Sequence, residues 1–284
     1  MIVEIKNSFI SLKISTLGAE MKSIKTSDGK EHLHLPDKLW EDQAPVLFPI
    51  CGYPVGDKIT VDGKDYPMKP HGFAMFSEFD IAEQTETSVT FVLKSSTETR
   101  LSYPYDFEFY VIYTLCGSSI DIKYKVINKN SGKMYFSVGS HDGHYCPGGL
   151  SDYEIHFEKT ESKKPIIYET GLVPEDSLAE CDGHSVLTLS DKLFDDSITV
   201  VYTNVDSNFV ILKNTKTAEE TKITYDGCEN LLIWTEPFSD FVCIEPWCGM
   251  ADYGKTHDDI SAKLGIHFLE ENGIFEINRV ITFC

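Results

Sequence analysis

The carboxylate of Glu245 stands at the end of an apolar run, in the segment Cys243-Ile244-Glu245-Pro246-Trp247. Burial penalises the charged form of a carboxylate and raises its pKa, which suits a general base that works near neutral pH. Pro246 has no amide hydrogen, so we expect strand pairing to break beside the carboxylate. Trp247 offers a flat apolar face on which sugar C–H groups can stack. The alternative is that Glu245 forms a buried structural salt bridge.

Two histidines flank an aspartate in the segment Gly139-Ser140-His141-Asp142-Gly143-His144-Tyr145. The segment ends a strand expected to begin near Tyr135, and residues where a strand meets a loop commonly line binding sites. Imidazoles and a carboxylate also suit zinc or iron. No H-E-x-x-H or similar helical spacing supplies the further ligand that such a site needs, so the sequence favours a site without a metal.

A third imidazole, His71, lies in the segment Pro70-His71-Gly72-Phe73, just before an apolar run. A loop at this point could present the ring to a binding site. By itself the pattern is more typical of a histidine that forms structural hydrogen bonds.

The elements that must position these side chains are expected to be strands. Apolar and polar residues alternate at 10–14 and 120–126, as in strands with one solvated and one buried face. The runs 107–115 and 231–234 are apolar on both faces, which predicts strands buried between two sheets. Helical periodicity is almost absent, and only 37–40 and 258–262 are expected to form one or two helical turns. The polar stretch 158–185 is expected to be a looped excursion.

The composition is that of a soluble globular protein, with 42% hydrophobic and 25% charged residues in 284. All-β proteins of this length often fold around one core, so we expect a single domain over residues 1–284. A formal net charge of −20 makes nucleic acid and anionic membranes unsuitable partners. No apolar run approaches the ~20 residues of a membrane span, and no secretion signal is visible, so we expect a cytoplasmic protein.

The eight cysteines form no C-x-x-C pair, so the sequence predicts neither a zinc knuckle nor a thioredoxin-like redox site. Their even number permits disulfides, but we expect free thiols, because reductants of the cytosol keep thiols reduced.

Taken in order along the chain, the segments form a pattern that resembles the aldose 1-epimerase (galactose mutarotase) family. The similarity extends over nearly the whole chain, and the segments that carry it are Thr16-Leu17-Gly18-Ala19-Glu20, Leu47-Phe48-Pro49-Ile50-Cys51-Gly52, Lys69-Pro70-His71-Gly72-Phe73-Ala74, Tyr103-Pro104-Tyr105-Asp106-Phe107, Gly139-Ser140-His141, Leu193-Phe194-Asp195-Asp196, Cys243-Ile244-Glu245-Pro246-Trp247 and Gly249-Met250-Ala251-Asp252.

The resemblance implies an all-β fold, an antiparallel β super-sandwich, and an enzyme that interconverts α and β anomers without a cofactor. Glu245 would take the proton from the anomeric hydroxyl, and His141 would protonate the ring oxygen. His71 would hold the sugar and stabilise the ring-opened intermediate. We expect Glu245 to start ionised and His141 to start protonated, with Asp142 or another carboxylate keeping His141 charged. Asp196 resembles a family aspartate that bonds sugar hydroxyls.

Two positions depart from the family pattern. An arginine that reaches the sugar is replaced by Tyr53, and the residue after His141 is Asp142 where the family has a proline. We expect Tyr53 to give its hydroxyl to the sugar, and Trp247 to contact it. The expected substrate is a neutral aldohexose such as glucose or galactose, bound by a monomer or homodimer. The alternatives are a non-catalytic carbohydrate-binding or regulatory protein on the same fold, and a metal-dependent hydrolase built on His141, Asp142 and His144.

Overall fold

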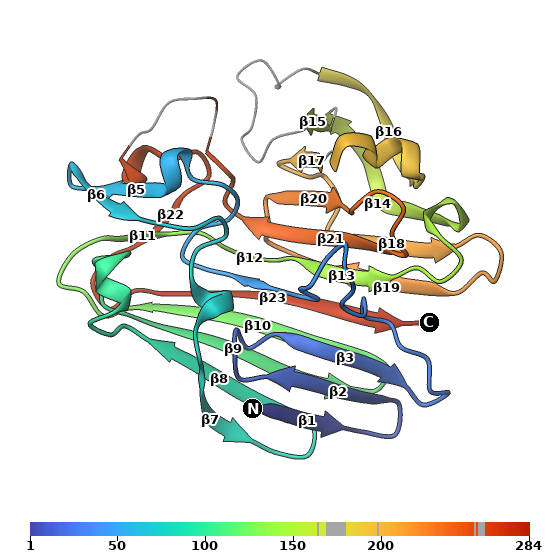
Figure 1. Cartoon of the computed structure of the whole chain (residues 1–284), viewed down its shortest axis with the longest axis horizontal. Coiled ribbons are helices and arrows are strands. Elements are labelled where there is room, and N and C mark those ends of the chain that lie inside the picture. The colour runs from blue at the N-terminus through green and yellow to red at the C-terminus, as the bar shows by residue number, and fades with distance from the viewer. Residues whose placement is uncertain (164, 169–179, 198, 253, 255–258) are drawn as a thin grey trace.

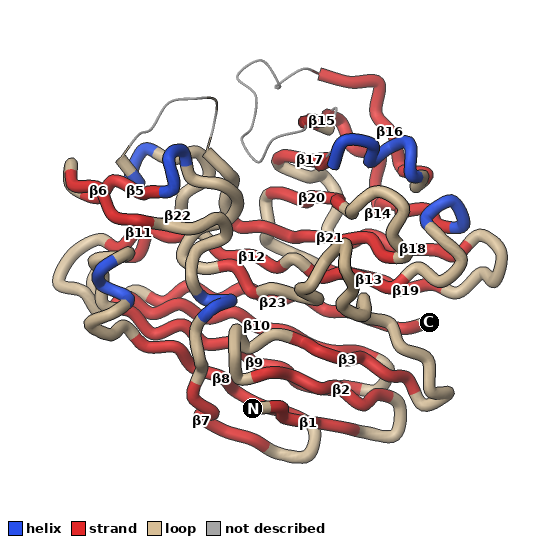
Figure 2. Tube along the Cα trace, in the orientation of Figure 1, coloured by secondary structure: helices blue, strands red, loops and turns tan. Residues whose placement is uncertain are grey.

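The computed structural model describes residues 1–163, 165–168, 180–197, 199–252, 254 and 259–284. Within these ranges all paired strands are antiparallel, and the helical elements are short 3-10 turns (Figure 2). The all-β prediction is therefore confirmed. No helix among the described residues has the length and apolar character needed to cross a membrane.

A nine-stranded sheet runs through the molecule, from β7 at the bottom of Figure 1 to β16 at its upper right. In spatial order its strands are β16 (Glu180–Thr188), β14 (Tyr153–Lys163), β18 (Phe209–Asn214), β19 (Glu220–Thr224), β23 (Ile274–Phe283), β10 (Ser119–Asn128), β9 (Phe107–Cys116), β8 (Ser88–Lys94) and β7 (Asp80–Gln84).

A seven-stranded sheet carries the residues singled out above. Its order is β15 (Ile166–Tyr168), β17 (Thr199–Thr203), β20 (Asn230–Trp234), β21 (Phe241–Cys248), β12 (Val138–Ser140) and β4 (Val46–Leu47), and β13 (Asp142–Tyr145) also pairs with β21.

Smaller sheets and turns complete the fold. A three-stranded sheet consists of β1 (Ile2–Lys6), β2 (Ile10–Ser15) and β3 (Met21–Thr26), and two ribbons consist of β5 (Lys58–Val61) with β6 (Lys64–Pro67) and β11 (Met134–Phe136) with β22 (His267–Leu269). The 3-10 turns are η1 (Val55–Asp57), η2 (Ala74–Phe76), η3 (Thr99–Leu101), η4 (Leu150–Asp152), η5 (Asp191–Ser197) and η6 (Ile260–Ala262).

The predicted strands are present, but their burial differs in part from the prediction. The alternating segments 10–14 and 120–126 lie in β2 and β10, and β10 buries every second side chain. The segment 107–115 forms β9, which also buries alternate side chains instead of both faces. Its second face is half-buried because Glu108 and Tyr110 lie on it. The prediction for 231–234 holds better, since β20 is buried at four of its five positions.

Three local predictions are wrong. The segment 37–40 is not helical, although the Asp37 carboxylate accepts hydrogen bonds from the amides of Leu39 and Trp40 at 2.7 and 3.0 Å. The loop expected over 158–185 is absent from its described residues, which contain the end of β14, all of β15 and the start of β16. The strands β14 and β16 pair with each other across a register shift, and residues 164 and 169–179 lie outside the described part of the structure. Pairing does not break at Pro246, because β21 continues through it in register with β20.

The helical turn expected at 258–262 is present in part, as η6. The Asp259 side chain caps it by accepting the Ser261 amide at 3.1 Å, and residue 258 lies outside the described part of the chain.

The core lies between the sheets in two main clusters of buried side chains. The larger cluster lies between the three-stranded sheet and the strands β8, β9 and β10. In Figure 1 the three-stranded sheet lies over these strands. Tyr113 on β9 donates its hydroxyl hydrogen to the carbonyl of Ala19 at 2.7 Å across this boundary. The second cluster joins β14 and β18 to β17, β20 and β21.

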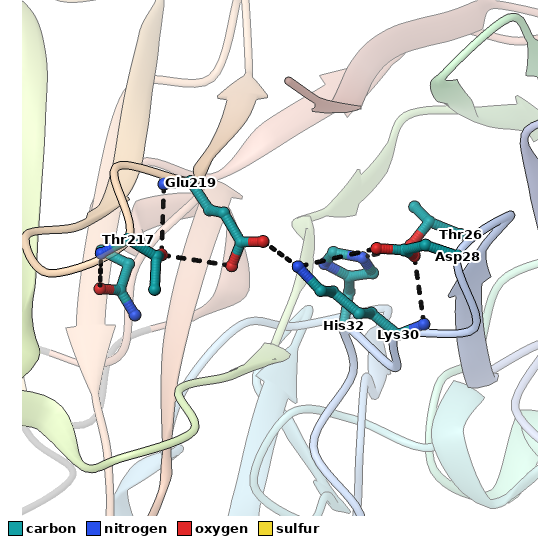
Figure 3. Close-up of polar contacts among 7 residues, drawn as sticks. Thr26, Asp28, Lys30, His32, Thr217 and Glu219 are labelled. Carbon is teal, nitrogen blue, oxygen red and sulfur yellow. Dashed lines mark hydrogen bonds and ion pairs between the residues drawn. The ribbon is translucent and has the colours of Figure 1, made fainter.

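A polar contact at the surface also links the three-stranded sheet to the nine-stranded one. Lys30, just after β3, forms an ion pair with Glu219 in the turn before β19, and its ammonium lies 3.6 Å from Asp28 (Figure 3). Because these side chains are about half exposed, the contact contributes little to stability.

A buried ion pair connects the two large sheets. Asp142 on β13 and Arg279 on β23 form a double contact, one arm of which measures 3.2 Å, and Arg279 also donates to the hydroxyl of Tyr124 at 3.1 Å. Asp142 and Arg279 are 0% and 3% exposed. The planar guanidinium suits such a double contact, and removal of one partner would leave an uncompensated charge in the core.

We predict that Asp142→Asn lowers the free energy of unfolding by roughly 3–5 kcal/mol, because Arg279 would stay buried without its counter-charge. The other arginine of the chain provides a matched control: Arg100 pairs with Asp106 at the surface, and Asp106→Asn should cost about 0–1 kcal/mol. Urea unfolding followed by circular dichroism measures both. Equal costs for the two variants would contradict the role assigned to the buried pair.

Candidate active site

Glu245 and His141 meet in the middle of the seven-stranded sheet. Glu245 lies on β21, opposite Leu232 of β20, and His141 lies between β12 and β13, both of which pair with β21. The amide of His141 donates to the carbonyl of Pro45 at 3.0 Å, which fixes the backbone there. His141 Nε2 lies 3.4 Å from Glu245 Oε1. The Glu245 side chain is 2% exposed and that of His141 14% exposed, so solvent reaches the pair from the histidine side.

His71 reaches the same place from a tight loop. Its backbone has a φ of +63°, and its amide donates to the carbonyl of Gly52 at 2.9 Å. Gly72 follows with a φ of +81°, and a Cβ there would stand 2.3 Å from the carbonyl oxygen of Phe48, so only glycine fits. The His71 ring lies 5.4 Å from that of His141 and nearly perpendicular to it.

The hydrogen bond made by the His71 ring defines its tautomer. Its Nδ1 accepts the amide hydrogen of Gly52 at 3.3 Å, so the ring proton of neutral His71 lies on Nε2. This leaves an N–H donor that a sugar oxygen can use.

Aromatic rings surround the histidines. The Trp247 ring lies 5.6 Å from that of His71, and its Nε1 donates to the carbonyl of Ser140 at 3.1 Å. A Cβ on Gly139 would stand 2.6 Å from this indole, so glycine leaves the space that it occupies. Trp40 and Trp234 each lie 5.3 Å from the His141 ring.

Sequence reasoning missed Trp40 and Trp234. Trp234 ends the predicted strand 231–234, and Trp40 ends the segment 37–40 that was expected to be helical. Neither carries a local signal beyond its residue type, because the contact with His141 arises only when distant segments meet.

Tyr53 and Asp196 are the two remaining candidate residues for sugar binding. The Tyr53 ring lies 6.0 Å from the His71 ring and is 47% exposed, so it lies at the solvent side of the cluster. Asp196 belongs to η5, but its side chain lies outside the described part of the structure, so its predicted contact with a sugar stays a prediction.

Burial controls the protonation of the three ionisable groups. It raises the pKa of Glu245 well above its usual value; the charge of Asp142 adds to this rise, and the Trp247 indole opposes it. Burial lowers the pKa of His71 to about 4 and that of His141 well below its usual value, where His71 contributes in the same direction. Burial therefore favours the uncharged forms of these side chains, opposite to the expected ionised Glu245 and protonated His141.

Asp142 does not support a charge on His141, contrary to expectation. Successive side chains of a strand point to opposite faces, and the Asp142 carboxylate faces Arg279 between the sheets. Asp142, which stands where the family has a proline, therefore forms a structural ion pair with Arg279.

The ligands of the alternative metal-dependent hydrolase, His141, Asp142 and His144, do not form a ligand cluster among the described residues. Among the described residues, His141 shares a possible ligand cluster with Cys243 and Glu245, with ligand atoms within 4.8 Å of one another, and not with Asp142 and His144. Burial raises the pKa of the Cys243 thiol well above its usual value, which opposes the thiolate that a metal requires. This donor set therefore fits a metal poorly.

Comparison with known proteins identifies the family. The sequence model of the family described as aldose 1-epimerase matches residues 1–255. The chain belongs to the aldose 1-epimerase family. The predicted resemblance is thereby confirmed.

Individual relatives agree with this assignment. The chromosomal protein LacX of Lactococcus lactis subsp. lactis is 35% identical over 267 residues, which cover 88% of this chain and 89% of LacX. A galactose mutarotase related enzyme from Lactobacillus acidophilus has a TM-score of 0.95 and 30% identity, covering 100% of this chain and 97% of that one. A galactose mutarotase-like protein from Lactobacillus casei has a TM-score of 0.92 at 26% identity, with 100% of both chains covered. The antiparallel super-sandwich is thus shared with galactose mutarotase-like proteins.

We predict that His71 of this epimerase-family chain stays uncharged between pH 7 and 5, because burial lowers its pKa to about 4. Its imidazole ¹⁵N signals, assigned with a His71→Gln variant, should be constant over this range and report the proton on Nε2. The half-exposed His156, which pairs with Glu154 at 2.9 Å, provides a comparison within the same spectra. Protonation of His71 near pH 6.5 would contradict the prediction.

Proposed function

We propose that the chain is a mutarotase that interconverts the α and β anomers of a neutral aldohexose. The observation that carries the proposal is the 3.4 Å approach of His141 Nε2 to Glu245 Oε1 beside an N–H donor on His71. Opening a hemiacetal ring requires removal of one proton and delivery of another at two oxygens bonded to the same carbon. An adjacent acid and base match that requirement, and the single domain 1–284 would need no cofactor.

In the proposed reaction, Glu245 takes the proton of the anomeric hydroxyl and His141 gives a proton to the ring oxygen. The raised pKa of Glu245 makes its carboxylate a stronger base, and the lowered pKa of His141 makes its imidazolium a stronger acid. His71 donates from Nε2 to the sugar and stabilises the open form. Rotation about the first carbon–carbon bond of the aldehyde, followed by closure with the roles reversed, gives the other anomer.

The alternative is a sugar-binding or regulatory protein of the same fold that lacks activity, since a fold alone does not establish chemistry. Polarimetry on freshly dissolved α-glucose or α-galactose separates the two proposals. A mutarotase accelerates the change in optical rotation, whereas a binder leaves the spontaneous rate unchanged.

We predict that Glu245→Gln lowers the catalysed rate by about 10²–10⁴-fold, because the amide keeps the shape of the side chain but cannot accept a proton. Polarimetry measures the rate, and circular dichroism checks the fold. Glu276→Gln, at a half-exposed position of β23, is the matched control and should keep the full rate. More than about a tenth of the wild-type rate in Glu245→Gln would refute the role of general base.

The two histidines should differ. His141→Asn should lose as much rate as Glu245→Gln, because it removes the acid. His71→Asn should lose less, because it removes only a hydrogen-bond donor. The reverse order would show that the two histidines exchange these roles.

The charges around the site favour an uncharged sugar. Arginine normally recognises a phosphate, and both arginines of the chain are paired elsewhere, Arg279 with Asp142 and Arg100 with Asp106. The buried ammonium of Lys263, near Cys51, forms an ion pair with Asp252, so its charge is already compensated. The net charge of −20 also disfavours the approach of a dianion.

We therefore predict a higher kcat/KM for glucose and galactose than for glucose 6-phosphate. Tyr53, with a hydroxyl in place of a guanidinium, cannot neutralise a phosphate. Rates for the three sugars, measured side by side at one ionic strength, test this. A Tyr53→Arg variant is expected to raise the relative rate on the phosphate, and a wild-type preference for the phosphate would refute the prediction.

A further inference from the structure

The imidazole of His141 has a polar contact at one of its two nitrogens. Its Nε2 lies 3.4 Å from Glu245 Oε1, whereas its Nδ1 is buried and forms no hydrogen bond to another described residue. The second nitrogen of a catalytic histidine usually donates to a carbonyl or a carboxylate, which orients the ring and stabilises its charged form. When His141 carries a proton on each nitrogen, as the proposed reaction requires, the N–H at Nδ1 has no such acceptor.

Four ionisable side chains lie around His141, and one of them can offset its charge. Glu245 and Cys243 approach from β21, with ligand atoms within 4.8 Å, and the His71 ring lies 5.4 Å away. Burial raises the pKa of the Cys243 thiol and keeps it uncharged, and a charge on His71 would repel one on His141. The carboxylate of Asp142 faces the space between the sheets. Among the described residues, Glu245 is therefore the only carboxylate in ion-pair contact with His141.

The indole of Trp40 contacts the same imidazole. The two ring centres are 5.3 Å apart, and the ring planes make an angle of 35°. Rings this close to parallel reach such a separation only when their faces overlap in part. An aromatic face attracts a cation within about 6 Å of the ring centre, and tryptophan attracts it most strongly. Trp40 is thus placed to stabilise a positive charge on His141.

Contacts from distant segments hold Trp40 in this position. A Cβ on Gly143 would stand 2.6 Å from the indole, so glycine there leaves the space that the ring occupies. The indole also stacks on Phe241, with ring centres 5.0 Å apart and planes 21° apart. The Asp37 carboxylate accepts the amide hydrogen of Trp40 at 3.0 Å. The segment 37–40, which was expected to be helical, therefore presents an indole to the proposed acid.

We propose that Trp40 is a positioning residue that stabilises the imidazolium form of His141 through the π face of its indole. The contact favours the ion-paired form of His141 and Glu245 over the form in which Glu245 holds the proton. More of the pair is then ready for ring opening, which starts from the charged form. The effect on the rate rests on the proposed function, but the stabilisation of the charge exists without a sugar.

The first test is the rate on a neutral aldohexose, measured by polarimetry. Trp40→Leu should lower kcat by about tenfold and change KM by less than about twofold, because it weakens the acid's charged form and removes no proposed contact with the sugar. The loss of charged His141 outweighs its greater strength as an acid, since the proton is only partly transferred in the transition state. Trp40→Phe keeps an aromatic face of weaker attraction and should recover part of kcat.

Phe268→Leu is the matched control. The half-exposed ring of Phe268, on β22, lies 4.3 Å from the ammonium of Lys133, so the variant removes a cation–π contact on the ribbon of β11 and β22. It should keep both kcat and KM.

Protein with fluorinated tryptophans decides the question if Trp40→Leu does not fold by circular dichroism. Ring fluorines withdraw electron density from the π face with little change in size, so the attraction of a cation weakens. The kcat should fall stepwise from unlabelled to monofluorinated to difluorinated protein. The same series in Trp40→Phe should show no such fall, which assigns the effect to Trp40.

A second test needs no catalysis and so separates this proposal from the proposed function. In Glu245→Gln, the ¹⁵N signals of His141 report the protonation of its ring. Addition of Trp40→Leu should move the midpoint of its titration down by about one pH unit, because loss of an interaction with the charged form lowers the pKa of the imidazole.

Equal midpoints in the two variants would overturn the proposal, and so would a ring that stays neutral in both down to acid unfolding, since Trp40 then stabilises no charge. A rise of KM in Trp40→Leu larger than the fall of kcat would make the indole a stacking surface for the sugar instead. Equal kcat for Trp40→Leu and Trp40→Phe would also contradict a role of the π face. If the wild type lacks mutarotase activity but the midpoints differ, the proposed function fails and the stabilisation of the charge stands.

Discussion

The buried ion pair between Asp142 and Arg279 is the contact on which the arrangement of the site depends. It bridges the two large sheets, and Asp142 directly follows His141 in the chain. A carboxylate that is held on one side of a strand fixes the direction in which the preceding side chain points. The double contact with Arg279 therefore anchors the backbone directly beside His141, whose Nε2 lies 3.4 Å from Glu245 Oε1.

The same geometry explains why the site can be small and rigid. Glu245 lies on a central strand with neighbours on both sides, so its backbone cannot shift without disturbing β20 and β13. Gly139 and Gly72 allow the indole of Trp247 and the loop of His71 to come close to the sheet. The side chains that meet the sugar in the proposed reaction are thus held by packing before any ligand binds, which is the arrangement that general acid–base catalysis requires.

The sequence predicted the strands well where one face is wet and the other dry, as in β2 and β10, because alternation has a direct physical cause. It failed for the described residues of 158–185, where polar residues form the paired ends of β14 and β16, since their pairing depends on partners elsewhere in the chain. The meeting of His71, His141 and Glu245 was predicted from family resemblance, because no local period connects them. The role of Arg279 could not be predicted from its neighbours in the sequence, because its partner Asp142 lies 137 residues away.

The protonation states of Glu245 and His141 determine which of them could donate a proton in the proposed reaction. Burial favours a neutral carboxyl on Glu245 and a neutral imidazole on His141, and the ion-paired form differs from this only in the position of one proton between the two side chains. The pair therefore holds one transferable proton in either form. Sugar hydroxyls that enter the site would stabilise the charged form by hydrogen bonds, and the proton would then pass to His141. In the proposed ring opening Glu245 would take one proton and His141 would release another, so a complete turnover would require no net exchange of protons with water.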